Sequence, residues 1–447
     1  MRRYITTFSL VVFGFFNLSV YPGPAVYNEV SSFKLSNGLR VILSPVDDIK
    51  AACLLLYHQT GVRDDPPGIR GASYLYQNLM LLGTKNLDTY DRILYLKRNG
   101  GFSDRIVSYD YSIFYQVVPA SDINNALYLE SERISSLQLT GSKVRAEQNR
   151  VYAKNYRLNN SNVHVMANNR VKSMLFPGTI YETPVYGNLE EIRGFDIQAV
   201  KKLYNNFRNL SNIIMVIAGG FDSAELKKSI NKYFGKLSFV PKLTRNVKKS
   251  DTSPVPRKKF VSENLLVDNF SEYFAFYGIP GPAKFNFDHL YFDFIRFYLV
   301  DERISKLEEI LNRERNLNVL ISYEIIDYLE ASALIIKIAA KRRANLERAR
   351  FFLVKKLDAL HKGTIPNAEV KITKSLMEID FMKKMSRLET RSAFLAEYFQ
   401  QTGKLNGEEN YLKRIRKINT YDIYRIAQTY LTKDNRVNLI VYPKPNR

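Results

Sequence analysis

Apolar positions in the first half of the chain predict four strand regions. In each region apolar residues occupy every position or every second position, which are the patterns of buried and half-buried strands. The regions are 33–43, 51–58, 102–119 and 212–220. Because Ser36-Asn37-Gly38 divides the first region, it predicts a hairpin, and the third region predicts two strands.

Helical spacing fills the intervals between these strands. Residues 68–86 predict a helix that is opened by glycines, is closed by Gly83 and turns Leu75, Leu79 and Leu82 to one face. Further helices are predicted at 88–99, 123–137, 142–156, 195–207 and 224–234. The segment that follows, 241–259, is polar, basic and proline-bearing, which is typical of an interdomain linker.

The second half repeats this plan weakly. Strands are predicted at 272–280, 317–326, 332–339 and 436–442, and helices at 289–315, 345–360, 368–398 and 420–431. The linker therefore separates a predicted N-terminal domain, 30–240, from a predicted C-terminal domain, 260–447. Each of the two is large enough to bury its own core.

The composition is that of a folded protein, with 45% hydrophobic and 13% aromatic residues in 447. The single cysteine, Cys53, lies inside an apolar run, which predicts a buried small side chain and excludes an intramolecular disulfide. The four histidines are spread along the chain, and none lies within four positions of another: His58, His164, His289 and His361. This spacing argues against a histidine-based metal site.

The chain carries a formal net charge of +22. Its lysines and arginines occur mostly as short pairs and triplets, with no nucleic-acid-binding motif and no interleaved aromatic residues. We therefore expect a solvated basic surface and no nucleic-acid partner. Attraction to an anionic membrane surface or to an acidic partner is the alternative reading of this charge.

The first 25 residues have the pattern of a secretory signal peptide. Met1-Arg2-Arg3 is basic, residues 8–20 are mainly apolar, and Tyr21-Pro22-Gly23-Pro24 breaks any helix. We expect an extracytoplasmic, periplasmic protein. Because the segment lacks a clean Ala-x-Ala cleavage pattern, an uncleaved N-terminal anchor is the alternative.

Several of these segments resemble the insulinase and mitochondrial-processing-peptidase family of zinc proteases, peptidase family M16. Residues 68–86 resemble its active-site helix, which carries His-x-x-Glu-His, an apolar run and a Gly-Thr-Lys-like ending. The Leu-x-Asn-Gly-Leu turn at 35–39, the segment 175–187 and the strand at 212–222 resemble other parts of the family pattern. The resemblance covers about residues 30 to 443.

The family's chemical positions are replaced in this chain. Tyr74 and Asn78 stand in place of the two histidines, and Gln77 stands in place of the glutamate. The family's spacing to its third zinc ligand, also a glutamate, leads from Asn78 to Asn155. Two imidazoles one helical turn apart can hold a zinc ion, and the carboxylate beside them can deprotonate its water. Tyrosine, glutamine and asparagine supply neither function well near neutral pH. We therefore expect no zinc and no other cofactor.

A second set of family positions is also replaced. Active members use an arginine and a tyrosine of the C-terminal half, or of a partner subunit, to hold the substrate backbone. Alignment of this chain places Asn312 and Val319 at those positions. A shifted register would instead recruit Arg313 or Arg315 with Tyr323, at a spacing that is wrong for the family.

The resemblance implies an α+β protein of two homologous domains, each a mainly antiparallel sheet packed with helices. With every catalytic position replaced, it implies a non-catalytic subunit that partners an active zinc peptidase around a peptide-degrading chamber. A homodimeric peptide-binding or scaffold protein is the alternative. A divergent metallopeptidase would have to build a new metal site from Tyr74, His58 or His164.

Overall fold

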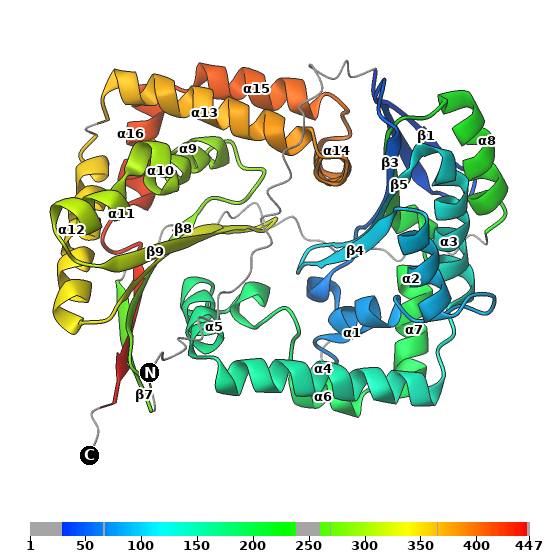
Figure 1. The fold of residues 1–447 in the computed structure, drawn as a ribbon, viewed down its shortest axis with the longest axis horizontal. Helices are drawn as coiled ribbons and strands as arrows, with labels where there is room; N and C mark the ends of the chain where they lie inside the picture. Colours follow the sequence, from blue (N-terminus) through cyan, green and yellow to red (C-terminus); the bar gives the residue numbers. More distant parts are fainter. Residues whose placement is uncertain (1–28, 66–67, 238–259, 269, 364, 445–447) are drawn as a thin grey trace, which may run out of the picture.

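A computed structural model describes residues 29–65, 68–237, 260–268, 270–363 and 365–444. The chain is an α+β protein of two domains, which form the right-hand and left-hand parts of Figure 1. The predicted fold class is therefore confirmed. The predicted signal peptide (1–25) and linker (241–259) lie outside the described residues.

The N-terminal domain contains a six-stranded sheet in the order β1-β2-β6-β3-β5-β4. Only β2 and β6 run parallel, and every other neighbouring pair is antiparallel. The central strands β3 and β6 are buried along almost their whole length, as their unbroken apolar runs predict. The strands are β1 (Ser31–Lys34), β2 (Arg40–Pro45), β3 (Ala51–His58), β4 (Phe102–Val107), β5 (Ser112–Pro119) and β6 (Ile213–Gly219).

The C-terminal domain repeats this topology with one strand fewer. Its sheet has the order β7-β11-β8-β10-β9, in which β7 and β11 form the parallel pair. Each of the five strands matches one of the first sheet in position and direction, β9 corresponding to the edge strand β4. The strands are β7 (Val261–Val267), β8 (Tyr273–Gly281), β9 (Val319–Asp327), β10 (Ser332–Ala340) and β11 (Val437–Pro443).

Each sheet is covered on one face by helices of its own domain. On the first sheet this core is formed with α2 (Thr89–Arg98), α3 (Ile123–Ser136) and α8 (Ser223–Phe234). On the second sheet it is formed mainly with α9 (His289–Val300), α12 (Arg343–His361) and α16 (Thr420–Tyr430). In the described part of the chain, no helix is long and apolar enough to cross a bilayer.

The opposite face of each sheet is covered by a helix from the other half of the chain. Helix α14 (Leu388–Thr402) packs Leu395 and Ala396 against β2, β3 and β6 of the first sheet. Helix α5 (Val163–Leu175) packs Val171 and Leu175 against β8 and β11 of the second. Figure 1 shows α14 beside the N-terminal sheet and α5 beside the C-terminal sheet. The domains are therefore interlocked by an exchange of helices.

Of the remaining helices, four belong to the N-terminal domain and four to the C-terminal domain. They are α1 (Ala72–Leu79), α4 (Gly141–Ser161), α6 (Leu189–Gly194), α7 (Ile197–Phe207), α10 (Glu302–Ser305), α11 (Leu307–Glu309), α13 (Asn367–Met385) and α15 (Gly407–Lys417). Cys53 is buried between β3 and α14, and burial raises the pKa of its thiol to about 12. The prediction of a buried small side chain is confirmed.

Two predicted helices are divided in the structure. The predicted helix at 368–398 is α13 followed by α14, because Arg387 is extended and turns the chain toward the first sheet. The predicted helix at 289–315 ends at Val300 and continues as α10, α11 and a π-helical turn, Ile310–Glu314. Neither break carries the proline or glycine that usually marks one. The predictions also missed α5, α15 and β7.

Because α14 covers one face of the N-terminal sheet, we expect that truncating a buried side chain of this helix destabilises the protein. Leu395 is only 2% exposed between α14 and the first sheet. We expect Leu395→Ala to lower the free energy of unfolding by about 2–5 kcal/mol, measured by urea titration. Leu266→Ala removes the same atoms from a side chain that is 54% exposed, and we expect a change below about 0.5 kcal/mol. Equal effects of the two substitutions would contradict the packing role of α14.

Candidate functional site

Helix α1 begins at a backbone position that only glycine occupies easily. Gly71 has φ of 96°, and a Cβ there would lie 2.3 Å from the carbonyl oxygen of Tyr186. The carboxylate of Asp65 accepts the N–H groups of Gly71 at 2.8 Å and Ser73 at 2.9 Å. Burial raises the pKa of Asp65 to about 7 despite these bonds. Leu75 and Leu79 of the predicted apolar face are buried, but the helix ends at Leu79 and does not extend to Leu82 and Gly83 as predicted.

Gln77, at the position predicted for the family's general base, is fully buried. Its side-chain nitrogen donates a hydrogen bond to the hydroxyl of Ser112 at the start of β5. The amide therefore ties α1 to the sheet. An amide does not gain or lose a proton near neutral pH, so Gln77 cannot act as a general base.

Asn78 lies between two arginines. Its side-chain oxygen accepts hydrogen bonds from Arg105 of β4 at 2.7 Å and from Arg150 of α4 at 3.2 Å. Its nitrogen donates to the carbonyl of Tyr74 at 2.7 Å. Glu147 compensates Arg150 through an ion pair, whereas Arg105 forms no ion pair within the described part of the chain. Two guanidinium groups thus lie at the position predicted for the second zinc ligand, where their positive charge would oppose binding of a dication.

Tyr74 and Asn155 make separate contacts. The ring of Tyr74 meets the ring of Tyr186 edge-on, with centroids 6.3 Å apart. Asn155 is buried and donates to the carbonyl of Val151 on its own helix at 2.9 Å. The structure brings Tyr74, Gln77 and Asn78 together on α1. Within the described part of the chain, Asn155 makes no hydrogen bond to any of these three residues.

Asn312 and Val319 are joined directly. The side-chain nitrogen of Asn312 donates to the carbonyl of Val319, and its oxygen accepts the N–H of Val319, both at 2.8 Å. The side-chain amide of Asn312 thus satisfies the backbone N–H and C=O at the start of β9, as the backbone of a neighbouring strand would. In the shifted register, Arg313 pairs with Glu309 and Arg315 lies over the ring of Phe352, while Tyr323 is half exposed.

The other proposed ligands, His58 and His164, lie in different surroundings. His58 is buried between Phe114 and Phe207, and its Nδ1 lies 3.2 Å from the carbonyl oxygen of Phe207. Burial lowers the pKa of His58 to about 3. His164 Nδ1 lies 2.6 Å from Lys337 Nζ in the core between α5 and the second sheet. Neither ring contacts Tyr74 in the described part of the chain.

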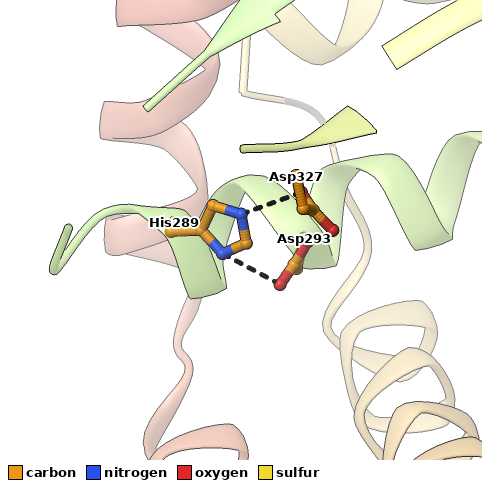
Figure 2. Close-up of side chains that lie close together, drawn as sticks. All are labelled: His289, Asp293 and Asp327. Atoms are coloured by element: carbon orange, nitrogen blue, oxygen red, sulfur yellow. Dashed lines mark hydrogen bonds and ion pairs between the residues drawn. The ribbon is translucent and has the colours of Figure 1, made fainter. Parts of the chain in front are cut away.

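A third group of side chains, missed by the sequence analysis, has the composition of a metal site. Figure 2 shows His289 between Asp293, one turn along α9, and Asp327 at the end of β9. Their ligand atoms lie within 4.8 Å of one another. The spacing of His289 and Asp293 was visible in the sequence, but the approach of Asp327 was not.

The charge of this third group is already compensated. Arg296 is 1% exposed and forms ion pairs with both Asp293 and Asp327, the latter at 2.7 Å. Burial raises the pKa of Asp327, but Arg296 and His289 outweigh it and hold the pKa well below its usual range. A dication would have to compete with a fixed guanidinium. We therefore interpret this group as a structural ion network.

Two family models match the chain. The model of insulinase (peptidase family M16) matches residues 40–187, and that of the peptidase M16 inactive domain matches residues 194–377. The chain belongs to peptidase family M16. The matches cover both domains, and the first includes Tyr74, Gln77, Asn78 and Asn155.

Individual relatives agree with this family assignment. The chain is 21% identical to the zinc protease PqqE of Helicobacter pylori over 93% of this chain and 92% of that protein. It is similar in fold to a protease from Helicobacter pylori, with a TM-score of 0.84, 20% identity and coverage of 93% and 100%. It is also similar to a peptidase M16 inactive domain from Pseudomonas fluorescens, with a TM-score of 0.79, 12% identity and coverage of 94% and 99%.

A further solved structure shares this fold. The first half of the periplasmic protease PqqL from Escherichia coli has a TM-score of 0.72 and 15% identity, with coverage of 94% of this chain and 93% of that one. At these identities the solved structures establish the fold alone. The activity of this chain must be argued from its own residues.

The buried imidazole of His58 predicts a loss of stability in acid. Its pKa is about 3 in the folded protein against 6.5 without burial, so the unfolded chain binds the additional proton between these values. The stability gained by burying this neutral imidazole is fully present above pH 6.5 and is lost as the pH falls toward 3. Between pH 7 and pH 5, His58 therefore lowers the free energy of unfolding by about 2 kcal/mol.

Urea titrations at pH 7 and pH 5 test this prediction. We expect His58→Gln, which does not titrate, to lose about 2 kcal/mol less than the original chain over this interval. Because the other histidines are present in both proteins, the difference isolates His58. Parallel losses in the two proteins would contradict a neutral buried imidazole.

Proposed function

We propose that this chain is a non-catalytic M16 protein that pairs with an active zinc peptidase of the same family. The observation that carries the proposal is the pair of arginines at Asn78, in a helix that also lacks the family's base at Gln77. An active partner would supply the His-x-x-Glu-His helix. This chain would supply the other wall of a peptide-degrading chamber.

The contacts of the replaced residues support this proposal. Gln77, Asn78, Asn155 and Asn312 each use an amide to hold backbone or side-chain groups of the fold. An amide satisfies such buried groups without carrying a charge. A glutamate at the same places would require the metal, or another charge, to compensate its burial. These residues thus support the fold in the absence of a zinc ion.

The second candidate is a homodimeric protein that captures extended peptides without cleaving them. The edge strand β4 favours it, because it lies beside α1 and exposes Phe102 and Ile106. An extended peptide can add to such an edge through backbone hydrogen bonds. The same edge would serve a non-catalytic subunit, so the two candidates differ in the identity of the second chain.

The proposed location is extracytoplasmic and periplasmic. It rests on the pattern of residues 1–25 and on the likeness to a structure that is itself described as a periplasmic protease. The basic surface could also bring the protein to an anionic membrane. These statements belong to the proposal.

The first test is the zinc content of the purified chain, together with peptide cleavage. We expect less than about 0.1 zinc per chain and no cleavage of a fluorogenic peptide. Mixing with a coexpressed M16 protein that carries His-x-x-Glu-His should produce a complex in size-exclusion chromatography and raise cleavage. Replacing that partner's glutamate by glutamine is the control, which should keep the complex and abolish cleavage.

Each outcome has a distinct meaning. One zinc per chain with cleavage by this chain alone would overturn the proposal. A self-dimer that binds peptides and ignores the partner would establish the second candidate.

A second test asks whether the two arginines exclude the metal. We compare a repaired chain (Tyr74→His, Gln77→Glu, Asn78→His, Asn155→Glu) with one that also carries Arg105→Gln and Arg150→Gln. Removing two nearby positive charges should tighten zinc binding by about tenfold or more, measured by competition with a chelating dye. The control adds Arg98→Gln and Arg348→Gln, two exposed arginines elsewhere on the surface. Equal zinc affinity in all three proteins would contradict the electrostatic argument.

A further inference from the structure

Five arginines are buried in the described part of the chain, and four of them pair with a carboxylate. The four pairs are Arg133 with Glu130, Arg296 with Asp327, Arg391 with Glu408 and Arg436 with Asp358. Arg92 is the exception. It is 4% exposed, and no described residue forms an ion pair or a hydrogen bond with its side chain. This exception needs a physical explanation, because an uncompensated charge in the interior is strongly destabilising.

Arg92 lies on the side of α2 that faces the core of the N-terminal domain. Leu96, one turn further along α2, packs in the same core as Ile134 of α3, and Figure 1 shows the two helices next to each other. Burial and the positive charge of Arg133 lower the pKa of Arg92 to about 10, and the carboxylate of Glu130 opposes this shift. Arg92 therefore lies near the pair of Arg133 and Glu130 and remains charged at neutral pH.

The carboxylate of Glu130 already has two partners. One oxygen accepts a hydrogen bond from the side-chain nitrogen of Gln116, and the other pairs with Arg133. The guanidinium of Arg133 also lies over the ring of Phe114, 4.2 Å from the ring centre. Two guanidinium groups thus share one carboxylate. Among the described residues, the interior between α2 and α3 carries an excess of one positive charge.

Several polar atoms around this group have no hydrogen-bond partner among the described residues. They include the Nε atoms of Arg92 and Arg133 and the hydroxyl of Tyr76, a fully buried side chain on which the charge of Arg133 acts. Buried polar atoms of this kind usually bind an ordered water or an ion. A water would accept the N–H groups but would leave the excess charge in place. An anion meets both requirements.

We propose that Arg92 binds a small monovalent anion, such as chloride, in the interior between α2 and α3. One negative charge would balance the excess beside Arg133 and Glu130, whereas a divalent anion would overcompensate it. The guanidinium N–H groups of Arg92 would be the donors. Because α2 packs on β4 and α3 packs on β5, the anion would join the two helices behind the edge of the first sheet. This binding does not depend on the proposed function.

Urea unfolding of the purified full chain at neutral pH tests the proposal while chloride replaces gluconate. The ionic strength stays constant, and chloride rises from about 1 to about 300 mM. An anion that binds only the folded chain makes the folding equilibrium constant rise in proportion to its concentration once the site is largely filled. We therefore expect this constant to rise about five- to tenfold over the last tenfold increase in chloride.

Three variants identify the residue responsible. Arg92→Met removes the charge, and its folding equilibrium constant should change less than about twofold over the same series. In gluconate alone this variant should be at least as stable as the original chain, because it no longer buries an uncompensated charge. Arg98→Met removes an exposed arginine of the same helix and should retain the full chloride response. Arg92→Lys keeps the charge and should retain a weaker response.

Two other anions locate the site and define its charge. Bromide can replace chloride and scatters X-rays anomalously, so crystals grown in sodium bromide should show an anomalous peak beside the Arg92 guanidinium. Crystals of Arg92→Met should lack this peak. Sulfate at the same ionic strength should stabilise the original chain and Arg92→Met alike, because its general exclusion from the protein surface does not require the site.

Each remaining outcome would overturn the inference. Absence of a chloride response in the original chain would mean that water alone satisfies Arg92. Equal responses in the original chain and Arg92→Met would show a general salt effect, and a bromide peak that persists without Arg92 would place the anion elsewhere. A sulfate response that requires Arg92 would exclude a monovalent anion. Loss of the chloride response in Arg92→Met, with its retention in Arg98→Met, would establish the site.

Discussion

The exchange of α5 and α14 between the two halves is the constraint on which the rest of the structure depends. Each sheet has two apolar faces, and only one is covered by helices that follow in the same half. The other face of each sheet is covered by the exchanged helix. Separating the halves would expose both faces at once, so burial of apolar surface fixes the domains against each other.

A polar junction accompanies this exchange. The buried carboxylate of Asp110, in the N-terminal domain, accepts the N–H of Leu329 and the guanidinium of Arg63, both at 2.9 Å. Arg63 also pairs with Glu330 of the C-terminal domain. Burial raises the pKa of Asp110, while these donors oppose the rise. The junction therefore orients two domains that apolar contact alone would only hold together.

Helices and strands with a strong local sequence pattern were predicted correctly, and those whose limits depend on distant parts of the chain were not. The runs at 51–58 and 212–220 gave β3 and β6 within one residue, because fully buried central strands require unbroken apolar sequence. The break at Arg387 was missed, since it is dictated by the distant sheet that α14 covers and has no proline or glycine. The exchanged helix α5 was missed for the same reason. Its partner surface lies in the other half of the chain.

The candidate site was predictable in part. The family pattern located Tyr74, Gln77, Asn78 and Asn155, but their contacts were not in that pattern. Arg105 and Arg150 are 27 and 72 positions from Asn78, and only the fold brings them to it. The bond between Asn312 and Val319 was likewise invisible, although both residues had been singled out as replacements.

If the chain has the non-catalytic role proposed above, these contacts explain how its fold is stable without a metal. A buried zinc site stabilises a fold through its ligands, and losing the ion leaves uncompensated polar groups. Here amides occupy the buried positions and bind groups already present in the fold. Asn312 goes further, because it closes part of an edge strand that would otherwise be open to unwanted pairing. Under the proposed function, the residues at the predicted catalytic positions therefore preserve the framework of the fold.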